Sequence, residues 1–282
     1  MHQVEGNLIK MPVSNHLDSS QCSLLILLAT QAEEDGLTEA AQACGLGFEK
    51  RNHPELGRYF WFGRVGAEIV IASRPWRESG RAVMGPHGRL GTAARGINLR
   101  NKTETQGIIQ LGMAFGVDYI KQRLGDVVVS RSLIPYDDRT IASDPDNPNG
   151  YRTDYGQALA QPARRSLVDL FEAEAERNQR SFNVHIGAIL SGSARIHSRK
   201  FRDELVFGVP HDPEEIVGGE MEGVGLLAAS TAADKPIWCV VKGISDFGDE
   251  NRGMVIDQGR VLACRNAAEF VLAALQNGPL GP

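Results

Sequence analysis

Asp246 is the residue of this sequence whose neighbours best suit acid–base chemistry. It follows the apolar run Ile237–Ile244 and comes directly after Ser245, whose hydroxyl could orient it. If that run is a strand, the carboxyl group projects into the crevice beyond its end, where it could protonate a leaving group. An aspartate after a strand is also a common helix cap or Asx-turn residue. Position alone leaves both interpretations open.

Two pairs of glutamates stand near the starts of predicted helices. Glu220 and Glu222 flank Met221 near the start of a predicted helix, and Glu33 and Glu34 open another. Carboxylates are stabilised at helix N-termini by the helix dipole, without any catalytic role. A glutamate can also accept two hydrogen bonds from a ribose diol, with a methionine packed on the apolar side of the sugar. Glu220 and Glu222 are therefore candidates for both roles, and Glu33 and Glu34 for the helix-start role.

The composition of the chain is that of a single large globular domain. Of its 282 residues, 42% are hydrophobic and 23% are charged, which suffices for one α/β domain with a covered core. The formal net charge of −5 argues against a general nucleic-acid-binding surface, so no nucleic-acid partner is predicted. Any phosphate would have to be recognised by a few placed arginines.

The sequence predicts a cytoplasmic protein without a cofactor or a metal. The four cysteines form no CxxC pair, which favours reduced thiols. The longest apolar run, Leu24–Ala29, is too short to cross a membrane, and residues 1–20 resemble a flexible leader rather than a signal peptide. The seven histidines show no HxxH or HExxH spacing typical of metal sites.

Apolar runs alternating with amphipathic segments predict the elements that position these residues. The expected strands are 24–29, 59–63, 67–72, 107–111, 126–130, 184–191 and 237–244; the expected helices are 34–43, a segment from near Thr92, 165–177, 223–233 and 261–275. Residues 112–116 are expected to form a turn and residues 136–163 a long loop. This alternation predicts one α/β domain over residues 21–278, with a mostly parallel twisted sheet flanked by helices.

Five motifs in order give the chain a family resemblance. Residues 217–249 contain Gly-Gly-Glu-Met-Glu-Gly and Gly-Ile-Ser-Asp, and they closely resemble the nucleoside phosphorylase/methylthioadenosine–adenosylhomocysteine nucleosidase superfamily. The supporting matches are Ala-Thr-Gln-Ala-Glu-Glu (29–34), Gln-Leu-Gly-Met-Ala-Phe-Gly (110–116), Gly-Asp-Val-Val-Val-Ser (125–130) and Ile-Leu-Ser-Gly-Ser-Ala (189–194). The resemblance implies that the chain cleaves the N-glycosidic bond of a nucleoside-type substrate.

The resemblance also implies roles for single residues. Asp246 resembles the general acid that protonates the leaving base, Glu222 the ligand of the ribose diol, and Met221 the residue packed against the sugar. Ile196 resembles the position whose backbone reads the adenine edge. The expected substrate contacts are completed by Met113, Ala114, Phe115, Arg195, Glu220, Ser245 and Phe247.

The turn after the first strand separates two branches of the family. Phosphorylases resemble one another in a Gly-Asp-Pro-x-Arg turn that grips phosphate, whereas this chain has Thr-Gln-Ala-Glu-Glu at residues 30–34. Carboxylates there would repel phosphate but could accept a proton from water. The spacing from Thr30 aligns Glu34 with the water-activating glutamate of nucleosidases, so the sequence predicts a hydrolase. Phosphorolysis, and a catalytically silent nucleotide sensor, remain as alternatives.

The substituent on the ribose 5′ carbon stays open. Arginines at 74, 77, 81, 89 and 95 surround a glycine-rich segment, and Arg195 stands where small nucleosidases look aromatic and apolar. Arg81 and Arg89 are candidates for a phosphate, although a single arginine is more often solvated or paired. The pattern Met-Gly-Pro-His-Gly-Arg (84–89) is similar to nucleosidase-like domains of immune and antiviral defence modules. An ATP- or AMP-type nucleotide and methylthioadenosine or adenosylhomocysteine are therefore both expected substrates, and relatives imply a homo-oligomer.

Overall fold

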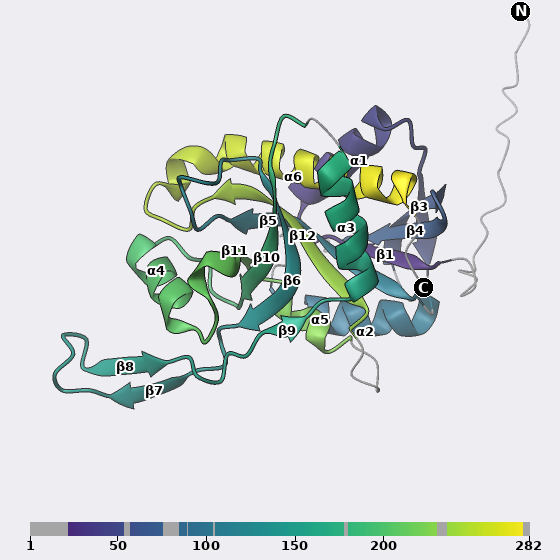
Figure 1. Ribbon diagram of the computed structural model, residues 1–282. Coiled ribbons are helices and arrows are strands. Elements are labelled where there is room, and N and C mark those ends of the chain that lie inside the picture. The colour runs from purple at the N-terminus through teal and green to yellow at the C-terminus, as the bar shows by residue number, and fades with distance from the viewer. Residues whose placement is uncertain are drawn as a thin grey trace, which may run out of the picture.

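The structure is a computed structural model that describes residues 22–53, 57–75, 85–88, 90–103, 105–177, 180–229 and 236–278 (Figure 1). The leader expected at residues 1–20 lies outside these ranges. The described residues form a ten-stranded sheet, a separate two-stranded sheet and the helices that cover the large sheet. None of the described helices has both the length and the apolar character needed to span a bilayer.

The large sheet runs in the order β11-β10-β6-β12-β5-β1-β4-β3-β2, with β9 paired to β6. Its strands are β1 (Leu24–Leu27), β2 (Glu49–His53), β3 (Gly57–Val65), β4 (Glu68–Ser73), β5 (Gly107–Phe115), β6 (Val127–Pro135), β9 (Gln161–Pro162), β10 (Val184–Ser191), β11 (Ile216–Glu220) and β12 (Trp238–Asp246). All residues of β1 and β12 are buried, as expected for strands covered on both faces.

The sheet is mixed, with parallel pairings in its centre. Strand β1 is parallel to β4 and β5, β12 is parallel to β5, and β10 is parallel to β6 and β11. Antiparallel pairing occurs where β12 meets β6 and along β2, β3 and β4. The predicted α/β class is confirmed.

Helices cover the sheet in two layers (Figure 1). Helix α6 packs on β12 and β5 and contacts both α1 and α3, whereas α2 packs against α5. The described helices are α1 (Gln31–Ala43), α2 (Thr92–Thr103), α3 (Arg165–Arg177), α4 (Arg199–Gly208), the 3₁₀ turn η2 (Pro213–Glu215), α5 (Val224–Leu227) and α6 (Arg252–Asn277).

Several predicted boundaries are wrong. The turn expected at residues 112–116 is the end of β5, which continues because β12 pairs with it as far as Phe115. The loop expected at 136–163 contains β9 and the hairpin of β7 (Thr140–Ser143) and β8 (Tyr151–Asp154), which projects from the body (Figure 1). Helix α5 is far shorter than 223–233, and α6 begins nine residues before Val261.

The sheet curls back on itself at one point. Gly219 of β11 pairs with Phe115 of β5, although β11 and β5 are not neighbours in the strand order. The contact requires glycine, because a Cβ at residue 219 would lie 2.0 Å from Cζ of Phe115. This closure brings the ends of β5, β11 and β12 around one pocket.

Candidate active site

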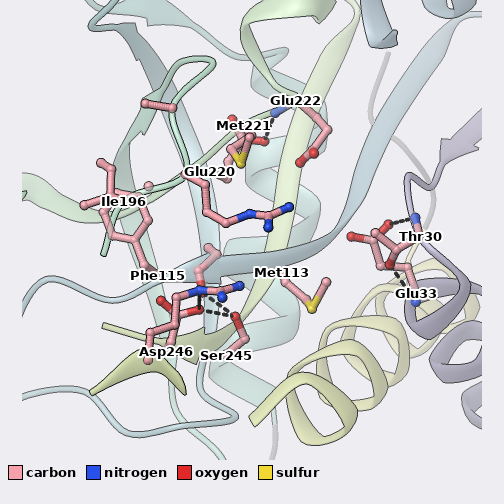
Figure 2. A pocket seen from close by; sticks show the side chains of 15 residues that line it. Thr30, Glu33, Met113, Phe115, Ile196, Glu220, Met221, Glu222, Ser245 and Asp246 are labelled. Atoms are coloured by element: carbon pink, nitrogen blue, oxygen red, sulfur yellow. Dashed lines mark hydrogen bonds and ion pairs between the residues drawn. The ribbon is translucent and has the colours of Figure 1, made fainter. Parts of the chain in front are cut away.

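The pocket at these strand ends gathers residues from widely separated parts of the chain (Figure 2). Asp246 and Glu33 lie at opposite ends of it in this view, with Met113 between them. Its lining consists of Thr30, Glu33, Met113, Ala114, Phe115, Ala194, Arg195, Ile196, Gly219, Glu220, Met221, Glu222, Ser245, Asp246 and Arg252. Ten of these residues are predicted substrate or catalytic contacts.

A bulge in β12 presents two consecutive residues to the pocket. Ile244 pairs with Ala114 and Asp246 pairs with Phe115, so Ser245 is the extra residue. Without the bulge, the alternation of a strand would turn one of the two side chains away. The Ser245 hydroxyl donates to Oδ2 of Asp246 at 2.9 Å, and the Gly248 amide donates to Oδ1 at 2.9 Å.

The end of β11 positions the Glu-Met-Glu segment. Both oxygens of Glu220 accept hydrogen bonds from backbone amides of Glu222 or Gly223, and Oε1 also accepts from the Ser191 hydroxyl at 2.6 Å. Glu220 thus ties β10 to the turn after β11. That turn directs Met221 and Glu222 into the pocket.

Lys242 lies fully buried beneath these carboxylates. Its ammonium is 2.8 Å from Oε2 of Glu222 and 3.5 Å from Oε2 of Glu220. Burial alone would lower the pKa of Lys242, but the charges of Glu222, Glu220 and Glu33 outweigh it and raise that pKa above its ordinary value. Lys242 therefore stays protonated and forms an ion pair with Glu222 beside the pocket.

Glu33 is the carboxylate that α1 supplies. Thr30 caps α1, and Oε2 of Glu33 accepts from the amides of Ala29 and Thr30, which completes a capping box. Oε1 approaches Gly112 so closely that a Cβ there would lie 2.1 Å from it. Burial, together with the charge of Glu222, raises the pKa of Glu33 despite the attraction of Lys242.

Glu34, predicted as the water-activating residue, lies elsewhere. Its carboxylate forms an ion pair with Arg74 and a second one with Lys50 at 3.7 Å, and it does not line the pocket. Successive residues of a helix point about 100° apart, so only one of the two glutamates can face the pocket. The structure places Glu33 there.

The other predicted contacts divide into three groups. Met113, Ala114, Phe115, Arg195 and Ile196 line the pocket as expected. Phe247 does not line it and stacks instead on Tyr119, with ring centroids 4.4 Å apart. Arg77, Arg81 and Arg89 lie outside the described residues.

Two arginines in and beside the glycine-rich region make structural contacts within the protein. Arg95 is buried and donates to the carbonyls of Leu28 at 2.9 Å and Ser73 at 2.7 Å, where β1 and β4 end. Burial lowers its pKa to about 10. Arg74 pairs with Glu34. These contacts account for the positions of both arginine side chains, so neither position requires a substrate phosphate as a partner.

Sequence reasoning missed three charged residues of the site. The capping-box spacing Thr-x-x-Glu marks Glu33 as the residue that folds back over its helix start, so that signal was present. Lys242 is a lone cation in an apolar strand, which requires an anionic partner when buried. Arg252, whose Nε lies 3.2 Å from Oδ2 of Asp246, carries no sequence signal. Within the described ranges, no three His, Cys, Asp or Glu residues are grouped so as to hold a metal ion.

The chain is thus an α/β protein whose mixed sheet curls around a pocket with carboxylates at both ends. The chain belongs to the phosphorylase superfamily, whose family model matches residues 23–276. It is 24% identical over 270 residues to the Death domain-containing ATP nucleosidase of Amphimedon queenslandica. That alignment covers 90% of this chain but 48% of the relative, so the chain spans about half of that protein.

Bacterial relatives match over most of their own length. The 5′-methylthioadenosine/S-adenosylhomocysteine nucleosidase of Haemophilus influenzae (strain PittGG) is 28% identical over 216 residues, covering 75% of this chain and 87% of that protein. The structure of the enzyme of that name from Neisseria meningitidis, in complex with methylthio-immucillin-A, superposes with a TM-score of 0.67 at 17% identity. That superposition covers 90% of this chain and 98% of the other. At that identity the structural match supports the fold.

Proposed function

We propose that the chain is a hydrolase that cleaves the N-glycosidic bond of an adenine nucleoside or nucleotide and releases the free base. The observation that carries the proposal is the arrangement of Glu33, Glu222 and Asp246 around one pocket, with Glu33 and Asp246 at opposite ends (Figure 2). Relatives named as ATP nucleosidase and as methylthioadenosine/adenosylhomocysteine nucleosidase support it.

Asp246 serves the base end of the reaction. The base leaves as a neutral species only if it is protonated, and N7 is the accessible nitrogen of a purine. Ser245 and the Gly248 amide fix the Asp246 carboxyl group, so that it donates to N7 in one orientation. Phe115 and Ile196 supply apolar surface for the ring at the same end of the pocket (Figure 2).

Glu222 serves the sugar. Its two oxygens accept from Lys242 at 2.8 Å and from the Gly85 amide at 3.2 Å, and a carboxylate has about four acceptor sites. The remaining sites accept the 2′- and 3′-hydroxyls of ribose. Met221 packs against the apolar face of the ring.

Glu33 activates the water molecule that acts as the nucleophile. The hydroxyl part of a water molecule bonds to C1′ as the C1′–N9 bond breaks, and the water's proton passes to Glu33. The bond electrons leave with the base, which takes its proton from Asp246. The raised pKa of Glu33 suits a general base. The carboxylates of Glu33 and Glu222 also stabilise the positive charge that develops on the sugar.

Water rather than phosphate is the proposed acceptor. A phosphate dianion at the same place would meet the Glu33 carboxylate with Glu222 and Glu220 nearby, which repels it. Phosphorolysis would give ribose 1-phosphate and depend on added phosphate, whereas hydrolysis gives the free sugar without it. A sensor would bind nucleosides without releasing base.

The test is release of free adenine from ATP, AMP, adenosine and methylthioadenosine by the purified chain and by Asp246→Asn. The amide cannot supply the proton, so its rate should fall about 10²- to 10⁴-fold. Asp169→Asn, an exposed aspartate of α3, is the matched control. Adenine released by Asp246→Asn at the normal rate would refute the acid assignment, and binding of the panel without turnover would favour the sensor.

We also propose that the chain forms a homo-oligomer. The β7–β8 hairpin pairs with no other described strand and projects from the body (Figure 1), and Ile141 and Tyr151 on it are 62% and 48% exposed. Ile120 and Phe207 are 97% and 74% exposed on the groove beside α4. Exposed apolar side chains of this size favour association with a second copy. Light scattering that gives the monomer mass at micromolar concentration would contradict this.

We also propose that the protein is cytoplasmic, and its cysteines support this location. Cys22, Cys44, Cys239 and Cys264 are all unpaired, and three of them are buried. Burial raises the pKa of Cys22 to about 11 and that of Cys239 to about 12, which keeps both as unreactive thiols. Cell fractionation with an antibody to the chain would test the location.

A further inference from the structure

One loop at the base end of the pocket belongs to no helix or strand. Residues 192–198, the base-end loop, connect β10 to α4, and Ala194, Arg195 and Ile196 of this loop line the pocket. Figure 2 places Ile196 near Phe115, at the end of the pocket assigned to the base. Because no sheet ladder or helix turn fixes such a loop, its position depends on the contacts that other segments make with it.

Two residues that follow β6 hold the base-end loop by hydrogen bonds. Strands β6 and β10 are parallel neighbours and end level with each other, so the residues after β6 meet the start of the loop. The Ser193 amide donates to Oδ2 of Asp137 at 2.7 Å. The Tyr136 hydroxyl donates to the Ala194 carbonyl at 3.2 Å. Together these bonds hold two consecutive residues of the loop, one of which lines the pocket.

The ring of Tyr136 also supports the loop by packing. Tyr136 is fully buried, and a Cβ at Gly192 would lie 2.4 Å from its Cζ atom, so the ring lies directly against the first residue of the loop. The ring belongs to the same hydrophobic cluster as Phe115 and Ile196. Burial, with the charge of Asp137, raises the pKa of Tyr136 above its ordinary value. The hydroxyl therefore stays protonated and remains a donor to the loop.

Tyr136 and Asp137 do not line the pocket, so their effect on a substrate must pass through the loop. A gap of about 0.5–1 Å between two surfaces forfeits about a quarter to a half of their dispersion attraction, so a small drift of the loop weakens its contact with a bound ring. We propose that Tyr136 and Asp137 are positioning residues that hold the base-end loop against the purine ring and thereby set the affinity of the pocket for the base. This inference rests on the proposed function and adds two residues to its base end.

The test measures the Kd of free adenine by calorimetry, because adenine carries no sugar and reports the base end alone. Tyr136→Phe removes the donor to Ala194, and Asp137→Ala removes the acceptor of the Ser193 amide. Each should raise the adenine Kd about 3- to 10-fold, the contribution of one hydrogen bond. Asp137→Asn keeps an oxygen that accepts from the same amide and should restore most of the affinity.

Two control variants make matching changes away from the loop. Tyr155→Phe removes a buried hydroxyl of the same hydrophobic cluster that makes no hydrogen bond to the base-end loop, and Asp138→Ala removes the exposed carboxylate beside Asp137. Both should bind adenine like the unmodified chain. In turnover of the best substrate, Tyr136→Phe and Asp137→Ala should raise KM by the factor seen for adenine and leave kcat level, because the loop contacts the base before and during the reaction.

An unchanged adenine Kd in Tyr136→Phe and Asp137→Ala would overturn the proposal, as would an equal rise in Tyr155→Phe. A fall in kcat at unchanged KM would also overturn it. If no nucleoside or nucleotide releases its base, the proposed function fails, whereas adenine that binds equally to the unmodified chain and both variants refutes the positioning role alone. Unfolding midpoints near that of the unmodified chain establish that the variants fold, and the exposed Asp137 keeps the test decisive if Tyr136→Phe melts early.

Discussion

Adjacent glutamates on α1 allow a strict test of the site. Glu33 lines the pocket and Glu34 pairs with Arg74, so Glu33→Gln and Glu34→Gln are the same chemical change one residue apart. Both keep the length and shape of the side chain. Only Glu33→Gln removes the proposed base, so only that variant should lose turnover.

The size of each effect follows from the contacts. Loss of a general base costs about 10²- to 10⁴-fold in kcat, or about 3–5 kcal/mol of transition-state stabilisation. Glutamine at residue 33 retains one acceptor oxygen for the amides of Ala29 and Thr30, so the capping box partly survives. Glutamine at residue 34 loses ion pairs whose carboxylate is 10% exposed, which should cost about 1–3 kcal/mol of unfolding free energy.

The assay is single-substrate adenine release, with thermal unfolding of the same samples. Glu33→Gln should be inactive without a fall in its unfolding midpoint, whereas Glu34→Gln should be active and melt several degrees lower. The opposite pattern, with turnover lost in Glu34→Gln and retained in Glu33→Gln, would refute the assignment. It would restore the role that the sequence spacing gives to Glu34.

Three more outcomes are expected. Lys242→Met leaves Glu220 and Glu222 without their cation and should cost about 3–5 kcal/mol in denaturant unfolding; a loss below about 1 kcal/mol would contradict the buried ion pair. Gly219→Ala should cost about 1–3 kcal/mol and raise KM, because its Cβ meets Phe115, while Gly47→Ala, with open space around it, should do neither. The raised pKa of Glu33 stabilises the fold below the ordinary glutamate pKa, and that stability is lost as pH rises through the folded-state value. The unfolding midpoint of Glu33→Gln minus that of the unmodified chain should therefore grow from pH 5 to pH 8, and a constant difference would contradict the shift.

The elements with strong local signals were predictable from the sequence. Val184–Ser191 and Arg165–Arg177 have the bounds that their apolar patterns predict, because burial of one face or of a whole strand fixes them. Strand β11 and helix α4 were missed. Gly218 and Gly219 weaken the strand signal of β11, and the reason for them is Phe115, which lies over Gly219 and is remote in sequence.

The site residues that belong to a motif were predictable from the sequence. The prediction failed where the packing of a helix determines which residue faces the pocket. Asp246, Met221 and Glu222 lie in the pocket as their motifs imply. The choice between Glu33 and Glu34 depends on the rotation of α1, which Thr30 sets by capping the helix. The spacing of residues in the sequence carries no information on that rotation. Likewise, the position of Arg252 next to Asp246 depends on how α6 packs against β12.

The pairing of Gly219 with Phe115 also bears on how the protein folds. About a hundred residues separate the two positions, so their contact closes a long loop of the chain. Contacts of such high sequence separation form late, after local hairpins and helices exist. The pocket should then assemble after the local helices and hairpins during refolding, and nucleoside binding would report a state in which β5, β11 and β12 have come together rather than any earlier intermediate.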